Sequence, residues 1–201
     1  MSDTNISIEG RTRLDILKAA LSAGKSGAHI APSLSCVEIC LALLMQYKED
    51  KDSIVLSKGH GALGYYAAMH QSGMITDEQF DSFEKNGGDF PGQPSRSLTN
   101  KIEYSSGSLG MGLSYALGVA LAKKKTSGDV YVVVGDGELN EGTNWEAAAL
   151  ASRYGLDNLI VVIDKNNLQS DGICEKIVGQ SLNKLWLAYG WHVKECWALG
   201  R

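Results

Sequence analysis

Two long apolar segments separated by a helical one constrain the fold of this chain more than any other feature. Residues 129–136 (DVYVVVGD) and 158–167 (NLIVVIDKNN) each contain a continuous apolar run, and residues 143–155 between them have helical spacing. Strands that are apolar on both faces and alternate with helices are typical of a parallel sheet covered by helices on both sides. We therefore predict an α/β fold, a three-layer αβα sandwich with a mainly parallel sheet.

The rest of the chain continues this alternation. Two more strands are predicted, at residues 52–57 and 191–199. Helices are predicted at residues 11–24, 33–47, 59–73, 76–85, 108–125, 143–155 and 181–190. With 201 residues, 44% of them hydrophobic, the chain can bury a substantial core, and we expect one domain over residues 1–201. Residues 86–104 read as a long loop, a feature that is usually functional in a compact domain.

Polar residues at three helix starts match the capping-box pattern, in which two side chains satisfy free backbone amides. The three pairs are Ser35 with Glu38, Thr76 with Gln79, and Thr143 with Glu146. These pairs predict helix starts at residues 35, 76 and 143.

Composition and charge exclude several classes of function. The formal net charge of −4 argues against a nucleic-acid partner, which would need a basic surface. No apolar stretch is long enough to span a membrane, and the polar N-terminus lacks the apolar core of a secretion signal. The four cysteines form no CxxC pair, which favours buried thiols in a reducing cytoplasm over a zinc site. We expect a cytoplasmic protein with no nucleic-acid or membrane partner.

The polar residues at the ends of the two apolar strands carry the chemistry. Asp136 stands between Gly135 and Gly137, and Asn166 and Asn167 follow the next strand, about one βαβ unit or roughly 30 residues later. If the strands are neighbours, a carboxylate and an amide oxygen meet at one edge of the sheet. Such ligands suit Mg²⁺ or Ca²⁺, and Mg²⁺ is usually completed by phosphate oxygens and water. An ordinary strand-end turn would explain GDG alone, but the asparagine pair favours a metal site.

With its strand context, GDGELNEG…KNNLQSDG closely resembles the thiamine diphosphate motif, and ELNEG with WEAAALA resembles transketolase in particular. Four further stretches agree, in the family's order: SGAHIAPSLSCVEI, DSIVLSKGHG, EYSSGSLGMGLSYALGVALA and LDNLIVVIDKNNLQSDG. Together they cover about residues 11–196. The chain resembles the diphosphate-binding (PP-type) half of a transketolase, as found in the N-terminal subunit of split transketolases. SGAHIAPSL is also similar to 1-deoxyxylulose-5-phosphate synthases.

The resemblance implies a cofactor, thiamine diphosphate, and a metal ion, Mg²⁺ or in its place Ca²⁺ or Mn²⁺. The metal would be held by Asp136, the Asn166 side chain and the Leu168 carbonyl. Cofactor contacts are implied for Gly107, Ser108, Leu109, Gly135, Asp136, Gly137, Glu138, Asn166, Leu168 and His60. Glu138 has a competing interpretation as a solvated acid near a helix start.

The resemblance also assigns catalytic roles to His29, His60 and Glu141. His60 would reach the diphosphate or the reacting centre, His29 would face the sugar substrate, and Glu141 would lie near a subunit interface. Simpler interpretations remain open: His60 as a turn residue, His29 as a surface histidine and Glu141 as a solvated acid.

The family's cofactor lies between two domains, and this chain resembles only the domain that binds the diphosphate. We therefore expect a separate partner, the pyrimidine-domain (C-terminal transketolase) subunit, in an α₂β₂ assembly or around a homodimer core. The implied reaction moves a two-carbon ketol unit from a ketose or ketose phosphate to an aldose or aldose phosphate.

Two departures from the family pattern keep alternatives open. Gln93 stands where the family usually has histidine; it can bind a sugar hydroxyl but cannot move a proton at neutral pH. The chain ends WALGR where the family continues, so we expect the domain to be truncated at its C-terminus. The alternatives are a subunit of another thiamine diphosphate enzyme, deoxyxylulose-phosphate-synthase-like or ketoacid-decarboxylating, and a non-catalytic remnant.

Overall fold

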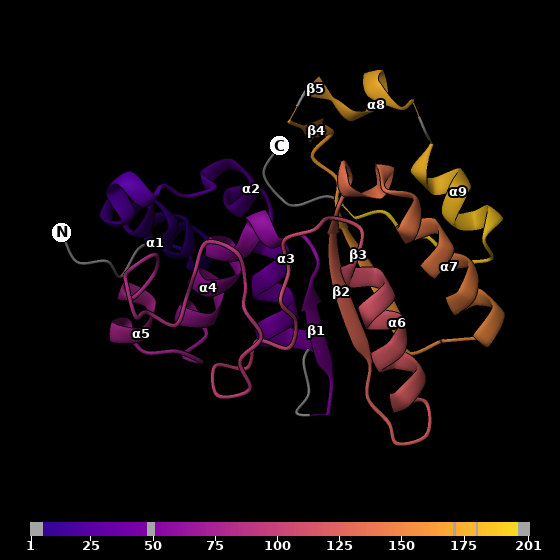
Figure 1. Ribbon diagram of the computed structural model, residues 1–201, viewed down its shortest axis with the longest axis horizontal. Coiled ribbons are helices and arrows are strands. Elements are labelled where there is room, and N and C mark those ends of the chain that lie inside the picture. Colours follow the sequence, from indigo (N-terminus) through magenta and orange to yellow (C-terminus); the bar gives the residue numbers. More distant parts are fainter. Residues whose placement is uncertain (1–5, 48–50, 171, 180, 197–201) are drawn as a thin grey trace.

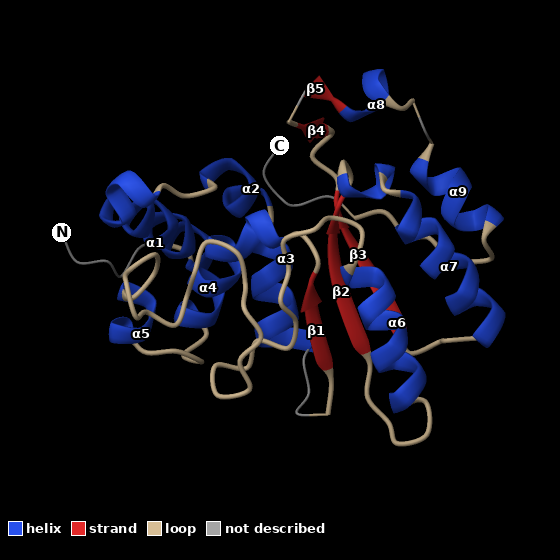
Figure 2. Cartoon of the chain, viewed as in Figure 1, coloured by secondary structure: helices blue, strands red, loops and turns tan. Residues whose placement is uncertain are grey.

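A three-stranded parallel sheet forms the centre of the chain in the computed structural model, which describes residues 6–47, 51–170, 172–179 and 181–196. The strands β1 (Ser53–Leu56), β2 (Val130–Gly135) and β3 (Leu159–Asp164) lie in the order β1-β2-β3 (Figures 1 and 2). Both pairings are parallel, and Gly135 lies opposite Asp164. The predicted strands at 52–57, 129–136 and 158–167 are confirmed, each with slightly shorter bounds.

Helices cover both faces of this sheet (Figure 2). On one side lie α1 (Ile8–Ala23), α2 (Ile30–Ser35), α3 (Val37–Ala42), α4 (Ala62–Gln71) and α5 (Asp77–Asp81), and on the other α6 (Gly112–Lys123), α7 (Gly142–Tyr154) and α9 (Leu182–Ala188). Alternate residues of the strands supply two separate cores. Ile54 and Val133 join the core with α3 and α4, whereas Val55 and Val132 join the core with α6 and α7. The predicted three-layer αβα sandwich is confirmed.

The predicted helix at 33–47 is interrupted. It begins earlier, at Ile30, breaks at Cys36 and ends as a π-helical turn, Leu43–Tyr47. The Ser35 capping box is therefore wrong: Ser35 is the last residue of α2, and its hydroxyl donates to Asp164 Oδ2 at 2.6 Å. Glu38 pairs instead with Arg13, 2.6 Å away.

Of the other two predicted capping boxes, one is confirmed and one is wrong. Thr76 forms the predicted capping box with Gln79 at the start of α5. The Thr143 box is wrong, because α7 begins one residue earlier with Glu141 as its N-cap. The Thr143 hydroxyl donates instead to the Gly110 carbonyl at 2.9 Å, so it ties α7 to the loop before α6.

Two further helices start later than predicted. The segment at 59–73 opens with a 3₁₀ turn, Gly59–Gly61, before α4. The helix expected from residue 108 begins at Gly112, because Gly110 has the left-handed φ of +84° that a right-handed helix excludes. Residues 107–111 are therefore a loop, which contains the GSL sequence.

The segment after β3 contains small elements that sequence patterns did not predict. β4 (Leu168–Gln169) and β5 (Gly172–Ile173) form an antiparallel hairpin, followed by α8 (Cys174–Ile177). The predicted strand at 191–199 is wrong for residues 191–196, which are irregular; its remainder lies outside the described residues. Trp191 instead packs edge-on against Trp186 of α9, with ring centroids 4.9 Å apart.

All four cysteines are free thiols. Cys36 and Cys40 are buried as expected, but Cys174 is only partly buried and Cys196 is exposed. In the part of the chain that the structure describes, no helix combines the length and apolarity needed to cross a membrane.

Candidate active site

The carboxyl ends of the three strands lie at one edge of the sheet, where open α/β sheets bind ligands. Lys58 follows β1 closely, Asp136 follows β2, and residues 165–167 follow β3. Because Gly135 lies opposite Asp164, Asp136 and the asparagine loop emerge side by side. This is the convergence that the spacing of the two motifs predicts.

Asp136 is a buried carboxylate, 4% exposed. Its Oδ1 accepts a hydrogen bond from the Gly137 amide at 2.9 Å, and its Oδ2 accepts a short one from the Asn167 amide. Burial raises the pKa of Asp136, and the two amide donors only partly oppose this rise. A cation beside this carboxylate would remove the cost of burying its charge.

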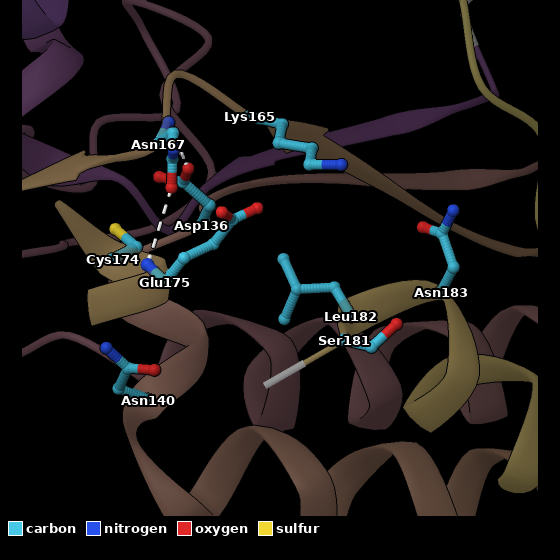
Figure 3. A pocket seen from close by; sticks show the side chains of 9 residues that line it. All are labelled: Asp136, Asn140, Lys165, Asn167, Cys174, Glu175, Ser181, Leu182 and Asn183. Atoms are coloured by element: carbon cyan, nitrogen blue, oxygen red, sulfur yellow. Dashed lines mark hydrogen bonds between the residues drawn. The ribbon is translucent and has the colours of Figure 1, made fainter. Parts of the chain in front are cut away.

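The asparagine loop, residues 165–167, follows β3, and Figure 3 shows Lys165 and Asn167 of this loop beside the same pocket as Asp136. Asn166 Oδ1 accepts a hydrogen bond from the Leu168 amide at 2.9 Å, and Leu168 is 63% exposed. The Asn167 side chain, with Asp136, lines a cavity of about 100 Å³, and its Oδ1 accepts from the Glu175 amide at 3.4 Å. The roles of Asn166 and Leu168 as metal ligands stay predictions.

The residues at this edge fit a hard cation that is shared with a diphosphate. Among the described residues, no group of three or more His, Cys, Asp or Glu side chains is arranged to hold a metal ion alone. The predicted donor set is instead one carboxylate with amide and carbonyl oxygens, a set that Mg²⁺ usually completes with phosphate oxygens and water. Ser106 Oγ, directly before the GSL loop, is buried and has no hydrogen-bond partner among the described residues.

Glycine at position 137 is required by close packing. A Cβ there would lie 2.8 Å from Gln169 Cβ and 3.6 Å from Cys174 Sγ. The backbone of Gly137 therefore passes directly under the hairpin that follows the asparagine loop. The Gln169 side chain also accepts a hydrogen bond from Asn140 Nδ2 at 2.6 Å, which ties the hairpin to the segment after GDG.

The two candidate catalytic histidines lie together. His29 precedes α2 and is exposed, and His60 lies in the 3₁₀ turn after β1. Their ring centroids are 6.4 Å apart. Burial, followed by the charges of Lys58 and His29, lowers the pKa of His60 to about 4. A histidine with this lowered pKa is neutral at pH 7, where it can donate or accept a hydrogen bond.

Gln93 and the GSL loop complete the surroundings of His60. A Cβ at Gly59 would clash with Gln93 Oε1 and lie 2.7 Å from Ser106 Oγ. Gln93 is exposed, as are Gly107, Ser108 and Leu109 of the loop. Gln93 and Ser106 thus lie against Gly59, the residue before His60, and Gln93 Oε1 would be 3.8 Å from a Cβ on Gly107.

Glu138 lies under the site, not on its surface. It is 2% exposed, so the interpretation as a solvated acid is wrong. Its Oε1 accepts hydrogen bonds from the Ser57 hydroxyl and from the Gly110 amide at 2.9 Å, and its Oε2 accepts from the Gly135 amide at 3.1 Å. Burial raises its pKa. Glu138 joins β1, the loop before α6 and β2; its cofactor contact stays a prediction.

Glu141, in contrast, is exposed at the start of α7. Its Cβ would lie 2.6 Å from a Cβ placed on Gly110, so its backbone is held against the same loop that Glu138 anchors. An exposed carboxylate at this position is available to a partner protein.

Sequence reasoning missed a buried ion pair between Lys58 and Asp164. Their side chains are 1% and 6% exposed, and the Lys58 ammonium contacts Asp164 Oδ2. The available signal was the placement of opposite charges at the ends of two apolar strands. The pairing becomes apparent only once both strands are known to belong to one parallel sheet.

The chain matches the family described as "Transketolase, thiamine diphosphate binding domain" over residues 44–198. It is 38% identical to a subunit of the apulose-4-phosphate transketolase of Actinobacillus succinogenes, covering 92% of this chain and 71% of that protein. It is 36% identical to "6-deoxy-6-sulfo-D-fructose transketolase subunit SqwG" of Clostridium sp., covering 96% and 75%.

Solved structures agree. The transketolase from Leishmania mexicana superposes with a TM-score of 0.80 at 27% identity, and that from Campylobacter jejuni with 0.71 at 26%. The alignments cover 92% and 93% of this chain, but the chain spans only 31% and 33% of those proteins. Together with the strand-end motif, these similarities show that the chain belongs to the transketolase family and contains its thiamine diphosphate binding domain.

Proposed function

We propose that this chain is the diphosphate- and Mg²⁺-binding subunit of a transketolase-like transferase. The enzyme would move a two-carbon ketol unit from a ketose or ketose phosphate to an aldose or aldose phosphate. The observation that carries the proposal is the buried Asp136 carboxylate at the end of β2, directly beside the asparagine loop that follows β3. A buried acid in a polar strand-end cleft of this fold is suited to a divalent cation and the phosphates that the cation binds.

In this proposal, each group of residues has one task. Asp136, Asn166 and the Leu168 carbonyl hold Mg²⁺, while Gly137, whose missing Cβ leaves room for Gln169, lies against the diphosphate. Thiamine diphosphate, when bound, would supply the nucleophilic carbon that ketol chemistry needs. His60, whose pKa is lowered to about 4, acts as a neutral hydrogen-bonding group, and the exposed His29 exchanges protons with sugar hydroxyls.

The sugar itself is proposed only as a class. Two relatives are named for apulose-4-phosphate and for 6-deoxy-6-sulfo-D-fructose, so the same domain occurs with phosphorylated and with sulfonated sugars. The exposed Gln93 beside Gly59 offers an amide to a sugar hydroxyl. An amide there recognises the sugar without moving a proton.

The need for a partner is also part of the proposal. Relatives over most of this chain are named as single subunits of a transketolase, and the described residues form one three-stranded sheet and one hairpin. A second polypeptide would supply the pyrimidine-binding domain, in an α₂β₂ assembly or around a homodimer core. We further propose that the enzyme works in the cytoplasm.

Calorimetry and a coupled assay test the function together. We expect thiamine diphosphate to bind in the presence of Mg²⁺, and ketol transfer to begin only when a pyrimidine-domain subunit is added. Full transfer by this chain alone would refute the need for a partner. Failure to bind the cofactor, with or without the partner, would refute the catalytic role and favour a non-catalytic protein.

A further inference from the structure

Lys58 is a deeply buried cation near the site, and its ammonium group reaches three acceptors. It donates to the Pro32 carbonyl and to the Ser35 hydroxyl, each at 2.9 Å, and to Asp164 Oδ2. Ser35 in turn donates to the same Asp164 oxygen at 2.6 Å. The three donor positions of the ammonium are therefore all matched within the protein.

The three acceptors come from segments that each hold a candidate functional residue. Pro32 and Ser35 lie in α2, directly after His29, and Asp164 ends β3, two residues before Asn166. Lys58 itself lies two residues before His60. The segments that place His29, His60 and the asparagine loop thus meet at one ammonium group, although they are far apart in sequence.

Because the Lys58 ammonium is buried, it favours one arrangement of the three segments. A charge removed from water is stable only if its partners are in place, and breaking such a pair is strongly unfavourable. Arrangements in which α2, the turn after β1 or the loop after β3 moves away would leave the ammonium or the Asp164 carboxylate unpaired. The ion pair therefore penalises displacement of any of the three segments.

We propose that Lys58 is a positioning residue, which through Pro32, Ser35 and Asp164 holds the histidine pair and the asparagine loop in the arrangement that binds the cofactor. This inference rests on the proposed function, because it assumes that these segments contact thiamine diphosphate and Mg²⁺. It assigns Lys58 no contact with the reacting atoms.

Lys58 has a second, electrostatic effect on the histidine pair. Burial is the main cause of the low pKa of His60, the positive charge of Lys58 comes next, then that of His29, while the carboxylate of Asp164 acts in the opposite direction. Removing the ammonium should therefore raise the pKa of His60. This readout needs neither the cofactor nor the partner.

The first test is Lys58→Met, which keeps the apolar stem and removes the charge. In NMR titrations of the full chain, we expect the pKa of His60 to rise from about 4 toward its ordinary value, and the resonances of His29 to shift. Lys85→Met, at an exposed lysine, is the matched control and should leave both histidines unchanged. An unchanged His60 in folded Lys58→Met would contradict the electrostatic effect and the proposal.

The second test separates positioning from folding stability. Lys58→Met alone leaves the buried Asp164 carboxylate unpaired, so it should lower the melting temperature; Lys58→Met with Asp164→Asn removes both charges and should recover much of it. Even with its stability recovered, the double variant should bind thiamine diphosphate and Mg²⁺ about 10- to 100-fold more weakly than the wild type in calorimetry. Substitutions of supporting residues at metal sites have effects of this size.

The outcomes distinguish this inference from the proposed function. A folded double variant that binds the cofactor as tightly as the wild type would overturn the positioning role of Lys58. If the wild-type chain itself binds no cofactor with the partner present, the proposed function fails, and the NMR titration of His60 alone then decides whether Lys58 organises the histidine pair.

Discussion

Charged side chains that face inward set the geometry of the site at the scale of single residues. Lys58 and Glu138 are both almost completely buried, and each bonds to groups from several segments. Lys58 joins α2 to the ends of β1 and β3, and Glu138 joins the ends of β1 and β2 to the GSL loop. A substitution at either residue should therefore affect several segments at once.

Replacing Glu138 by glutamine should lower the stability of the folded chain, although the two side chains have nearly the same shape. Both carboxylate oxygens accept hydrogen bonds from backbone amides, of Gly110 and Gly135, so the amide group of glutamine places a donor against one of these donors. We expect a loss of about 1–3 kcal/mol in the free energy of unfolding, measured by denaturant titration. Glu146→Gln, at an exposed position of α7, should change it little; an equal loss in both variants would refute this role of Glu138.

His70 should make stability depend on pH. Its ring lies between Asp15 of α1 and Asp77 of α5, with nitrogen–oxygen distances of 2.9 and 2.8 Å, and it stacks on Phe80. Burial alone would lower its pKa, but the hydrogen bonds to the two carboxylates outweigh burial and raise it above 6.5. The folded state therefore holds the proton more tightly than the unfolded state.

The sign follows from this raised pKa. The stabilisation by protonated His70 should be fully present below the unfolded pKa of about 6.5 and should disappear as pH rises through the higher folded pKa. The difference in melting temperature between the wild type and His70→Gln should accordingly be large near pH 6 and shrink in alkaline buffer. A difference that stays constant or grows with pH would contradict this account.

Close helix contacts decide the packing at the scale of elements. A Cβ at Gly64 of α4 would lie 2.5 Å from the Ser33 carbonyl oxygen of α2, so the two helices cross in direct backbone contact. On α6, the position of Gly118 has nothing within 4 Å of such a Cβ. Substitution by alanine should therefore have opposite effects on the free energy of unfolding at these two glycines.

Gly64→Ala should force α2 and α4 apart and cost about 1–3 kcal/mol in the free energy of unfolding, as overpacked cores do. Gly118→Ala should raise that free energy by about 0.5–1 kcal/mol, because alanine loses less backbone entropy than glycine in a helix. Thermal and denaturant unfolding of both variants measures this. Destabilisation by Gly118→Ala, or none by Gly64→Ala, would be inconsistent with the packing described.

Elements whose signals are local were predicted well from the sequence. The signals for the strands before Asp136 and Asn166, and for the Thr76 cap, each lie in a few neighbouring residues. All three elements are present in the structure. The break at Cys36 was missed because α2 makes contacts with distant segments, and the late start of α6 was missed because no short pattern shows that Gly110 has a left-handed φ. The Ser35 hydroxyl, for example, bonds across the molecule to Asp164, where a local cap was expected.

The candidate site divides in the same way. Its residue types and the convergence of Asp136 with the asparagine loop followed from spacing along the chain. The buried pair of Lys58 with Asp164 and the three bonds of Glu138 did not. Which charge faces inward depends on the order of the strands, which no short motif reveals.

At the scale of the whole molecule, the three strands are parallel, so the segments that follow them lie at one edge of the sheet (Figure 1). The histidine pair lies on the side of α2 and α4, and the asparagine loop lies next to Asp136, beyond the end of β2. The central claim is that Asp136 holds Mg²⁺ for a diphosphate at this edge. The strand-end position, the burial of the carboxylate and the family resemblance all support that claim.

Asp136→Ala provides the most direct measurement of this claim. Calorimetry with thiamine diphosphate and Mg²⁺, on the chain with the proposed pyrimidine-domain partner, should show binding by the wild type and by Asp157→Ala, a control at an exposed position. Asp136→Ala should remain folded but show no Mg²⁺-dependent binding. Cofactor affinity that survives in a folded Asp136→Ala chain would contradict the account.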